Sequence, residues 1–436
     1  MPDTRITIAE ARARVLAATF RLGEERVGID EALDRVLARD VRAAGDVPPF
    51  PCSAMDGYAV KAGPAERTLT VVGESQAGAP SARRVGDGEA IRISTGAAIP
   101  DGAEAVIRQE DVERRDARTT ARTAVAQGDQ IKTNAAVDEP DQIKTNAAVD
   151  GADQIQTTAP VAEGENVREA GDDMRAGTTS VVAGTILRAA ELGAVVAAGA
   201  GEVSVSIKPR VSILSTGDEL RAPGEPLGPG EIHNSNAPML AALAIHAGAI
   251  AAPAQRLPDD RAHTEAALGE ALERSDVVLI SGGVSVGPHD LVKPALAALG
   301  VEQLFWRVAL RPGGPTWFGK RGGKLVFGLP GNPVSAFVTF SLFARPALAA
   351  LQGAGPDRML DREATLGVAV QRNPRLEQAV RVRLERRDGA TVAFPTGPQG
   401  SHILMSLLQA DALALIPPGG GELEAGTTVT LESLPS

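Results

Sequence analysis

The spacing of hydrophobic residues changes along the chain and predicts regions of different structure. Thr7-Ile-Ala-Glu10 has the pattern of a capping box, and the apolar residues behind it predict a helix to about Phe20. A second short helix is expected from Asp30 to Ala38. From about Val47 to Ala159, β-prone runs alternate with Gly, Pro and charged turns, which predicts a small antiparallel module; the runs are Thr68–Val72, Ala90–Ser94 and Ala105–Gln109.

The second half of the chain alternates between strand and helix patterns. A strand is expected at Val203–Ile207. Three strand patterns, each followed by a helical pattern, then predict a parallel sheet covered on both faces. The strands are Val211–Leu214, Val277–Ile280 and Lys324–Gly328, and the helices are Ala237–Ala247, Leu291–Leu299 and Val334–Ala349. From about Arg358 the pattern returns to short strands and turns, which predicts a small β-barrel or sandwich.

A tandem repeat interrupts the β-rich region. The ten residues Asp129–Asp138 recur identically at Asp141–Asp150, and a third, partial copy begins at Asp153. The spacing of 12 residues is too short for the units of a solenoid. We expect an extended, partly mobile surface loop without chemistry of its own.

Composition excludes several classes of protein. A length of 436 residues predicts about three domains, and 43% hydrophobic with 23% charged residues is typical of a soluble globular protein. No uninterrupted apolar run approaches the length of a membrane span, and the N-terminal sequence lacks an apolar signal core, which favours the cytoplasm. A net charge of −11 with 3% aromatic residues argues against nucleic-acid binding. Cys52 is the only cysteine, and no histidine spacing suggests zinc.

Loops of small and hydroxyl residues follow all three predicted parallel strands. They are Ser215–Leu220 (STGDEL), Ser281–Gly287 (SGGVSVG) and Leu329–Ser335 (LPGNPVS). The carboxyl ends of parallel strands meet at one edge of a sheet, where ligands bind. Glycine amides and the start of a helix favour an anion there. One such loop alone would be only a turn, whereas three together predict a pocket for a phosphorylated ligand.

The acidic residues of these loops require a separate explanation. Asp218, Glu219 and Asp290 would repel an anion unless a divalent cation lay between them. Mg²⁺ commonly binds one or two carboxylates together with phosphate oxygens of the substrate. We therefore expect Glu219 and Asp290 to be Mg²⁺ ligands, whereas Asp218 is expected to stabilise its own turn. Cys52, without a nearby histidine or second thiol, is expected to be inert.

With these residues assembled, the chain closely resembles the MoeA/gephyrin E-domain family, the molybdopterin molybdenumtransferases of molybdenum cofactor biosynthesis. The resemblance extends over nearly the whole chain and rests on ordered motifs at Pro48–Ala59, Thr95–Ala103, Gly164–Asp173, Ser215–Leu220, Ser281–Gly287, Leu329–Ala336 and Gln399–Ile403.

The resemblance implies a multidomain fold of the α/β plus β class. It divides the chain into an N-terminal helical region with a β-rich insertion (1–206), a MogA-like parallel-sheet α/β domain (207–357) and a C-terminal β-barrel (358–436). It also implies a homodimer, with an active site between the MogA-like domain of one subunit and the N-terminal region of the other. A MogA-type adenylyltransferase is the candidate partner protein.

The implied reaction inserts molybdate into adenylylated molybdopterin and releases AMP with the help of Mg²⁺. The acids that match functional positions of the family are Asp56, Asp173, Glu219, Asp259 and Asp290. The expected substrate-binding residues come from the three loops, a later arginine segment and the C-terminal region; they are Thr216, Gly217, Ser281, Gly282, Gly283, Ser285, Gly287, Arg307, Arg311, Pro330, Gly331, Asn332, Ser335, Arg381 and Ser401.

The chain departs from the family pattern in one segment. Where many members carry lysines, this sequence has Arg307, Arg311 and Gly314. The two arginines keep the charge and bind oxyanions well, whereas Gly314 loses one lysine. Molybdate is an anion, so we expect amides and cations to hold it rather than the acids.

Two other functions remain open at this point. A molybdopterin adenylyltransferase shares the α/β domain but would not need the N-terminal region or the C-terminal barrel, so the length of the chain argues against it. A non-catalytic scaffold of the same fold is the second alternative, and the presence of all five matching acids argues against that reading.

Overall fold

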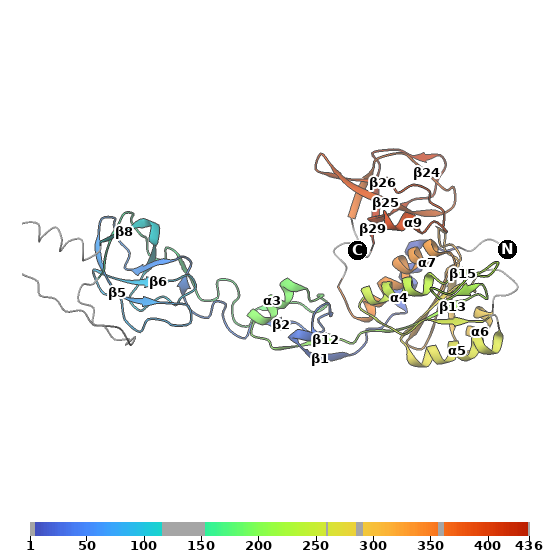
Figure 1. Ribbon diagram of the computed structural model, residues 1–436, viewed down its shortest axis with the longest axis horizontal. Coiled ribbons are helices and arrows are strands. Elements are labelled where there is room, and N and C mark those ends of the chain that lie inside the picture. Colours follow the sequence, from blue (N-terminus) through green and yellow to red (C-terminus); the bar gives the residue numbers. More distant parts are fainter. Residues whose placement is uncertain (1–4, 116–152, 259, 285–290, 356–361, 435–436) are drawn as a thin grey trace, which may run out of the picture. The chain divides into compact units, whose positions relative to one another are not determined.

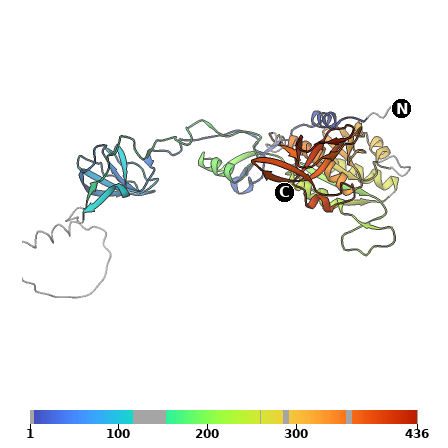
Figure 2. The same ribbon diagram turned by 90° about the horizontal axis from the view of Figure 1, so that it is seen from above.

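The computed structural model describes residues 5–115, 153–258, 260–284, 291–355 and 362–434. The chain forms two compact units. The larger unit comprises Met1–Asp40, Val181–Gly193 and Gly201–Ser436, and the smaller unit comprises Val41–Ser180 and Ala194–Ala200. Figures 1 and 2 show residues 41–115 of the smaller unit in blue to cyan, and the C-terminal strands of the larger unit in orange to red.

The smaller unit is built around a six-stranded sheet. Its order is β7 (Ala105–Arg108), β4 (Gly57–Val60), β6 (Glu89–Ile93), β5 (Thr68–Ser75), β9 (Gln154–Thr157) and β8 (Val112–Arg115). All neighbours are antiparallel except β5 and β6, which are parallel. Two pairs of short strands complete the unit: β2 (Val41–Arg42) with β11 (Thr179–Val181), and β3 (Cys52–Ser53) with β10 (Val167–Arg168). The predicted antiparallel module is confirmed apart from the β5–β6 pair.

The prediction of a loop is wrong for the third copy of the repeat. This copy forms β9, between β5 and β8, and its Ile155 is 1% exposed in the core of the sheet. The alternation of Gln154, Ile155 and Gln156 fits a strand with one buried face. The two complete copies, at 129–150, lie outside the described residues.

The N-terminal part of the larger unit holds one predicted helix and lacks the other. The helix α1 (Ile8–Ala17) begins with the predicted capping box at Thr7 and Glu10. The helix expected at 30–38 is wrong, because only a short 3₁₀ turn (Ile29–Glu31) forms there. Asp34 then adopts a left-handed backbone conformation, with φ 59°. Leu37 is buried and bridges to Val205 of β12 (Glu202–Ser206), which pairs with β1 (Glu24–Gly28).

A mixed sheet forms the centre of the larger unit. Its order is β16 (Ile250–Ala251), β13 (Arg210–Thr216), β18 (Val277–Ser281), β22 (Lys324–Leu329), β21 (Trp317–Arg321) and β19 (Glu302–Trp306), and β17 (Gln255–Leu257) also pairs with β13. The strands from β16 to β22 are parallel, as predicted, whereas β21 and β19 are antiparallel additions.

Helices cover both faces of this sheet, as Figure 1 shows. One core cluster includes residues of α1, α4 (Asn236–His246), α7 (Pro333–Thr339) and α8 (Arg345–Leu351). The cluster on the other face includes residues of α5 (Arg261–Arg274) and α6 (Val292–Ala298). Helix α5 was not predicted from the sequence. A further helix, α3 (Ala189–Ala197), follows the short strands of the N-terminal half.

The predicted helix at 334–349 is interrupted by a wide turn. A π-helical segment (Phe340–Ala344) separates α7 from α8. Pro346 has no N–H group, so the carbonyl of Leu342 loses its helical partner. The Nε of Arg12 on α1 donates to that carbonyl at 3.0 Å and replaces the missing bond. Among the described helices, Pro333–Leu351 is long and apolar enough to span a membrane, but 72% of its apolar stretch is buried inside the protein.

The C-terminal region is a closed five-stranded barrel, as predicted. Its strands follow the order β25 (Glu377–Arg387), β26 (Ala390–Pro395), β23 (Arg362–Leu366), β29 (Thr428–Ser433) and β27 (Ala412–Ile416), and β27 pairs back with β25. The short strand β20 (Leu310–Arg311) joins β25 in parallel and so connects the barrel to the α/β part. Two smaller elements, the pair β24 (Val370–Gln371) with β28 (Glu422–Leu423) and helix α9 (Met405–Leu408), lie in the same region.

Candidate functional site

The three loops that follow β13, β18 and β22 meet at one pocket. We call it the loop pocket; its volume is about 450 Å³. Its lining residues come from the ends of all three strands and from the starts of α4 and α7; they include Thr216, Glu219, Asn236, Ser281, Gly282, Gly283, Pro330, Gly331 and Asn332. The structure therefore brings together residues that the sequence placed more than 100 positions apart. Ser285 and Gly287, also expected here, lie outside the described residues.

Two glycines allow the loops to approach this closely. Gly282 and Gly283 have φ values of 88° and 67°, which favour glycine. A Cβ at Gly282 would lie 2.8 Å from the Thr216 hydroxyl oxygen, and one at Gly283 would lie 2.7 Å from a Val292 methyl group. Their backbone shape and the space around them exclude other residues, so the loop after β18 can lie directly against the end of β13.

One amide connects two of the three loops. Asn236, the first residue of α4, donates from Nδ2 to the Ser281 hydroxyl oxygen at 2.8 Å and to the Gly331 carbonyl at 2.7 Å. Its side chain is 8% exposed. Asn236 was missed from the sequence, because its partners become visible only once β18 and β22 lie side by side.

A second pocket is lined by basic residues, and we call it the basic pocket. Its volume is about 610 Å³, and Arg5, Arg307, Arg311 and His402 line it without any acidic residue among its described lining. It shares Pro315, Pro330 and Asn332 with the loop pocket. Several basic side chains in one lining favour an anionic ligand. Ser335, expected to bind substrate, also lines this pocket.

The barrel contributes to the basic pocket through the loop 398–401. Asn332 Nδ2 donates to the Ser401 hydroxyl oxygen at 2.9 Å, and the Val334 amide donates to the Ser401 carbonyl at 3.2 Å. Ser401 therefore joins the barrel to the start of α7, at the wall that both pockets share.

Arg381 does not line either pocket. Its side chain is 0% exposed, and burial lowers the pKa of its guanidinium to about 10. It donates to the Gln399 and Gly400 carbonyls at 3.3 and 3.1 Å and to the Ser406 hydroxyl oxygen at 3.0 Å. The expectation that Arg381 touches substrate is corrected accordingly, because its donors hold the loop 398–401 from beneath.

An aromatic side chain connects the two pockets on another side. The Trp306 indole N–H donates to the Val284 carbonyl, in the loop after β18, at 3.2 Å. Lys293 Nζ and the Arg307 guanidinium lie over the Trp306 ring, at 3.9 and 4.4 Å from its centre. Such cation–π contacts restrain the cations near the basic pocket. Gly314 lies in the same lining, and a Cβ there would lie 3.2 Å from the Leu310 carbonyl oxygen.

The expected acids are not assembled by the described residues. Glu219 lines the loop pocket and is the only carboxylate in its described lining. Asp259 and Asp290 lie outside the described residues. Asp218 is exposed, and its carbonyl accepts from Arg221, consistent with a turn residue. Among the residues that the structure describes, no group of three potential metal ligands occurs.

The remaining two acids belong to the smaller unit. Asp56 accepts from the Thr95 amide at 2.7 Å and from the Thr95 hydroxyl at 2.9 Å, and these bonds lower the pKa of Asp56. Asp56 is therefore ionised over the physiological range. Asp173 is exposed, and its backbone amide donates to the Val47 carbonyl at 2.9 Å. Cys52, expected to be inert, is buried.

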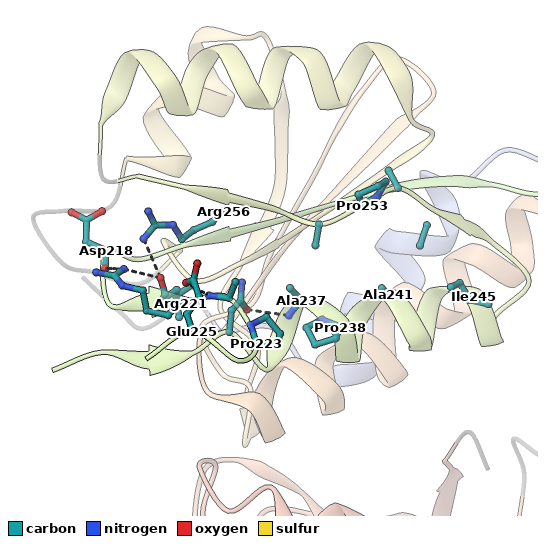
Figure 3. Close-up of a pocket in the computed structure, with 16 residues that line it drawn as sticks. Asp218, Arg221, Pro223, Glu225, Ala237, Pro238, Ala241, Ile245, Pro253 and Arg256 are labelled. Carbon is teal, nitrogen blue, oxygen red and sulfur yellow. Dashed lines mark hydrogen bonds between the residues drawn. The ribbon is translucent and has the colours of Figure 1, made fainter. Parts of the chain in front are cut away.

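A groove beside the loop pocket was not predicted. Figure 3 shows this groove of about 960 Å³, with Ala237, Pro238, Ala241 and Ile245 of α4 on one side and Pro253 on the other. Its charged residues gather at one end; they are Asp218, Arg221, Glu225 and Arg256. The groove shares Leu220 and Asn234 with the loop pocket.

Comparison with known proteins covers nearly the whole chain. Three family models match: the MoeA N-terminal region (domain I and II) at residues 6–199, a probable molybdopterin binding domain at 212–350, and the MoeA C-terminal region (domain IV) at 363–434. A molybdopterin molybdenumtransferase of Haemophilus influenzae is 32% identical and matches over 98% of both chains. Molybdopterin molybdenumtransferase 2 of Mycobacterium tuberculosis is 33% identical over 94% of both chains.

Solved structures agree with these matches. The molybdopterin biosynthesis MoeA protein of Pyrococcus horikoshii has a TM-score of 0.77 and 29% identity, covering 99% of this chain and 100% of that chain. A second structure of that protein has a TM-score of 0.73 and 30% identity. The expected fold class, with a MogA-like α/β domain, a β-rich N-terminal region and a C-terminal barrel, is confirmed. The sequence motifs, the order of the domains and the full-length similarity together show that this chain belongs to the MoeA family.

Proposed function

We propose that the chain is a molybdopterin molybdenumtransferase, which inserts molybdate into adenylylated molybdopterin and releases AMP in molybdenum cofactor biosynthesis. The observation that carries this proposal is the shared wall of the two pockets, formed by Pro315, Pro330 and Asn332. A pocket of amides and hydroxyls suits phosphate groups, and a basic pocket directly beside it suits a second anion. The relatives named molybdopterin molybdenumtransferase support a molybdopterin compound and molybdate as the two anions.

The loop pocket is the proposed site of the phosphate groups. Thr216, Ser281 and the glycine amides supply donors without a fixed charge, and Asn332 places the start of α7 at the same wall. Breaking the phosphoric anhydride to release AMP requires one oxygen nucleophile, which water or molybdate supplies. The donors would stabilise the negative charge that develops on the phosphate oxygens during that step.

The basic pocket is the proposed site of molybdate. Arg307 and Arg311 provide two permanent charges, and the Ser401 hydroxyl lies beside Asn332 at the shared wall. Arginine presents several N–H donors in a plane and binds tetrahedral oxyanions through pairs of bonds. The missing lysine at Gly314 leaves these two arginines as the cations of this segment in the lining.

The loop pocket supplies the small number of carboxylate ligands that Mg²⁺ requires from a protein. Mg²⁺ usually binds one or two carboxylates and completes its coordination with water and substrate phosphates. Glu219 supplies one carboxylate at the loop pocket, and Asp290 is the second ligand that the resemblance suggests. When bound, the ion would neutralise part of the anhydride charge.

Several expectations from the resemblance are retained as proposals. They are the division at 1–206, 207–357 and 358–436, the homodimer, the partnership with a MogA-type adenylyltransferase, the cytoplasmic location, and functional roles for Asp56, Asp173 and Asp259. The matches to the N-terminal and C-terminal MoeA regions favour the molybdenumtransferase over an adenylyltransferase, which does not need these regions.

The proposal is tested by following AMP. Purified protein receives adenylylated molybdopterin and Mg²⁺, and AMP release is measured as molybdate is added. Molybdate should stimulate release, and Arg311→Ala should raise the molybdate concentration for half-maximal stimulation about tenfold or more, because a hydrogen bond to a charged group contributes ~1.5–3 kcal/mol.

The matched control is Arg321→Ala. Arg321 lies at the end of β21 and pairs with Glu273 on the surface, away from both pockets. If the rate of AMP release did not change when molybdate was added, this would contradict the proposed function. An equal response of the Arg311 and Arg321 variants would contradict the assignment of molybdate to the basic pocket.

A further inference from the structure

The amide of Asn236 fixes the direction of a hydroxyl group in the loop pocket. Both hydrogens of its Nδ2 are used, one on the Ser281 hydroxyl oxygen and one on the Gly331 carbonyl. The reverse orientation of the amide is excluded, because the Gly331 carbonyl can only accept a hydrogen bond. The Asn236 nitrogen, and not its oxygen, therefore faces Ser281.

This bond decides where the Ser281 proton can point. A serine oxygen that accepts one hydrogen bond still carries its own hydrogen, which needs a different acceptor. Within the described part of the chain, the Ser281 hydroxyl donates to no protein acceptor. Ser281 is 3% exposed and lines the loop pocket together with Gly282 and Gly283.

The Asn236 amide leaves one buried hydrogen-bond acceptor unpaired. Asn236 Oδ1 is buried and has no hydrogen-bond partner in the described structure. An unpaired buried acceptor destabilises a protein, so an apolar side chain would suit this position better if only packing mattered. The two donors of the amide are the property that an apolar side chain would lose.

We propose that Asn236 is a positioning residue that directs the Ser281 hydroxyl hydrogen toward a phosphate oxygen of the substrate and holds the Gly331 loop beside it. This inference rests on the proposed function, which places the phosphate groups in the loop pocket. In this role the Asn236 side chain acts on Ser281 rather than on the substrate. It acts by making Ser281 a donor to the pocket rather than an acceptor.

Binding of inorganic pyrophosphate, measured by calorimetry, tests the inference without requiring turnover. Asn236→Ala and Ser281→Ala should each weaken binding about tenfold, the size of one lost hydrogen bond. The double variant should bind about as weakly as Ser281→Ala alone, because Asn236 acts only through the Ser281 hydroxyl, which the double variant lacks. A hundredfold loss in the double variant would show independent action and overturn the proposal.

A second variant reverses the bond while keeping the shape of the side chain. In Asn236→Asp the carboxylate accepts from the Ser281 hydroxyl, which turns the hydrogen away from the pocket. Pyrophosphate binding should fall by at least the tenfold of Asn236→Ala. Unchanged binding in Asn236→Asp, or no pyrophosphate binding by the unaltered protein, would also overturn the proposal.

Ser275→Ala is the matched control for loss of a buried hydrogen bond. Ser275 precedes the opposite end of β18. Its hydroxyl donates to the Ala271 carbonyl at 2.5 Å and lies 3.0 Å from the Ser212 hydroxyl oxygen, so its loss should lower stability without changing pyrophosphate binding. Failure of the proposed function would be distinguishable, because pyrophosphate would still bind and respond to Asn236 while molybdate failed to stimulate AMP release.

Discussion

At the scale of single residues, the loop pocket depends on two glycines that lack a Cβ and on the side-chain amide of Asn236. Gly282 and Gly283 lack the Cβ that would meet Thr216 and Val292. Asn236 donates both hydrogens of its amide, one to the Ser281 hydroxyl oxygen and one to the Gly331 carbonyl. The shape of the pocket thus depends on the close approach of the loop after β18 to the end of β13, and its chemistry depends on the direction of the hydrogen bond from Asn236 to Ser281. Each property can be tested at a single position.

Replacing Gly283 by alanine should push the loop after β18 away from its neighbours and destabilise the protein. The substitution adds a methyl group 2.7 Å from Val292 in a left-handed backbone conformation, so we expect a loss of unfolding free energy on the order of 2–4 kcal/mol. Chemical denaturation measures it. Gly300→Ala is the control, since Gly300 has a similar φ of 75° with open space around it and should show only the smaller conformational cost. Equal losses at the two positions would contradict the steric argument.

Glu377 should make stability depend on pH. Burial raises the pKa of Glu377, although Arg12 opposes the shift. Folding therefore favours the protonated form. The stabilisation is fully present below the ordinary pKa of 4.5 and is lost as pH rises through the pKa of the folded state. Glu377→Gln cannot ionise, so this variant should be more stable than the unaltered protein at pH 7, with the difference shrinking toward pH 4. Thermal melting over this range measures the effect, and a constant difference would contradict it.

At the scale of elements, the barrel is attached to the α/β part by buried charge and by strand pairing. Glu432 on β29, with its side chain 2% exposed, binds both Arg12 on α1 and Arg345 on α8. Strand β20 pairs with β25 at the other junction. Because the loop 398–401 belongs to the barrel, these attachments also determine where Ser401 lies at the basic pocket.

Removing the charge of Glu432 should weaken this junction. Glu432→Gln leaves two arginines without their carboxylate, and we expect a loss of about 2–3 kcal/mol, less than for a wholly buried pair because Arg12 is 28% exposed. Chemical denaturation provides the measurement. Glu424→Gln, on an exposed turn of the same barrel, should change stability little. A similarly small effect at Glu432 would show that the ion pairs do not hold the barrel in place.

The elements also show which parts of the fold were predictable. Strands β13, β18 and β22 are largely apolar and are buried on both faces, so pattern alone identified them. Helix α5 was missed because its apolar positions are mostly alanines among charged residues. Strands β16 and β17 have only two and three residues, too few to show a period. The helix expected at 30–38 failed because tertiary pairing of Leu37 outweighed local propensity.

The sequence predicted those site residues that directly follow a predicted strand. Thr216, Ser281 and Gly331 follow directly from strand ends that meet at one edge. Arg381 was misplaced because its motif shows proximity to the cleft and does not show which way the side chain points. The basic pocket needed the barrel loop at Ser401, whose contact with Asn332 spans regions that no local pattern connects.

At the scale of the whole molecule, the repeat lies in the connection between two paired strands. Arg115 of β8 is opposite Gln154 of β9, so residues 116–153 join two positions that are already adjacent. The paired ends fix the hairpin whatever the length of the connection.

Deleting residues 129–152 should leave the fold intact. The deletion removes the two complete copies and keeps the third copy, which forms β9. Shortening the connection by roughly a factor of three reduces the entropy cost of closing it by about 1 kcal/mol, so the melting temperature should be equal or slightly higher. Circular dichroism checks the fold, and AMP release checks the activity. Unfolding of the deletion variant would show that the upstream copies contribute to the sheet.

The position of β9 has a consequence at the level of the gene. A copy gained or lost during replication changes the coding sequence by a multiple of three nucleotides, so the reading frame survives. The new residues enter a hairpin whose two ends are already held together by β8 and β9. Natural isolates should therefore differ in copy number at this one place, while the length between β13 and β22, where the loops must meet, stays constant.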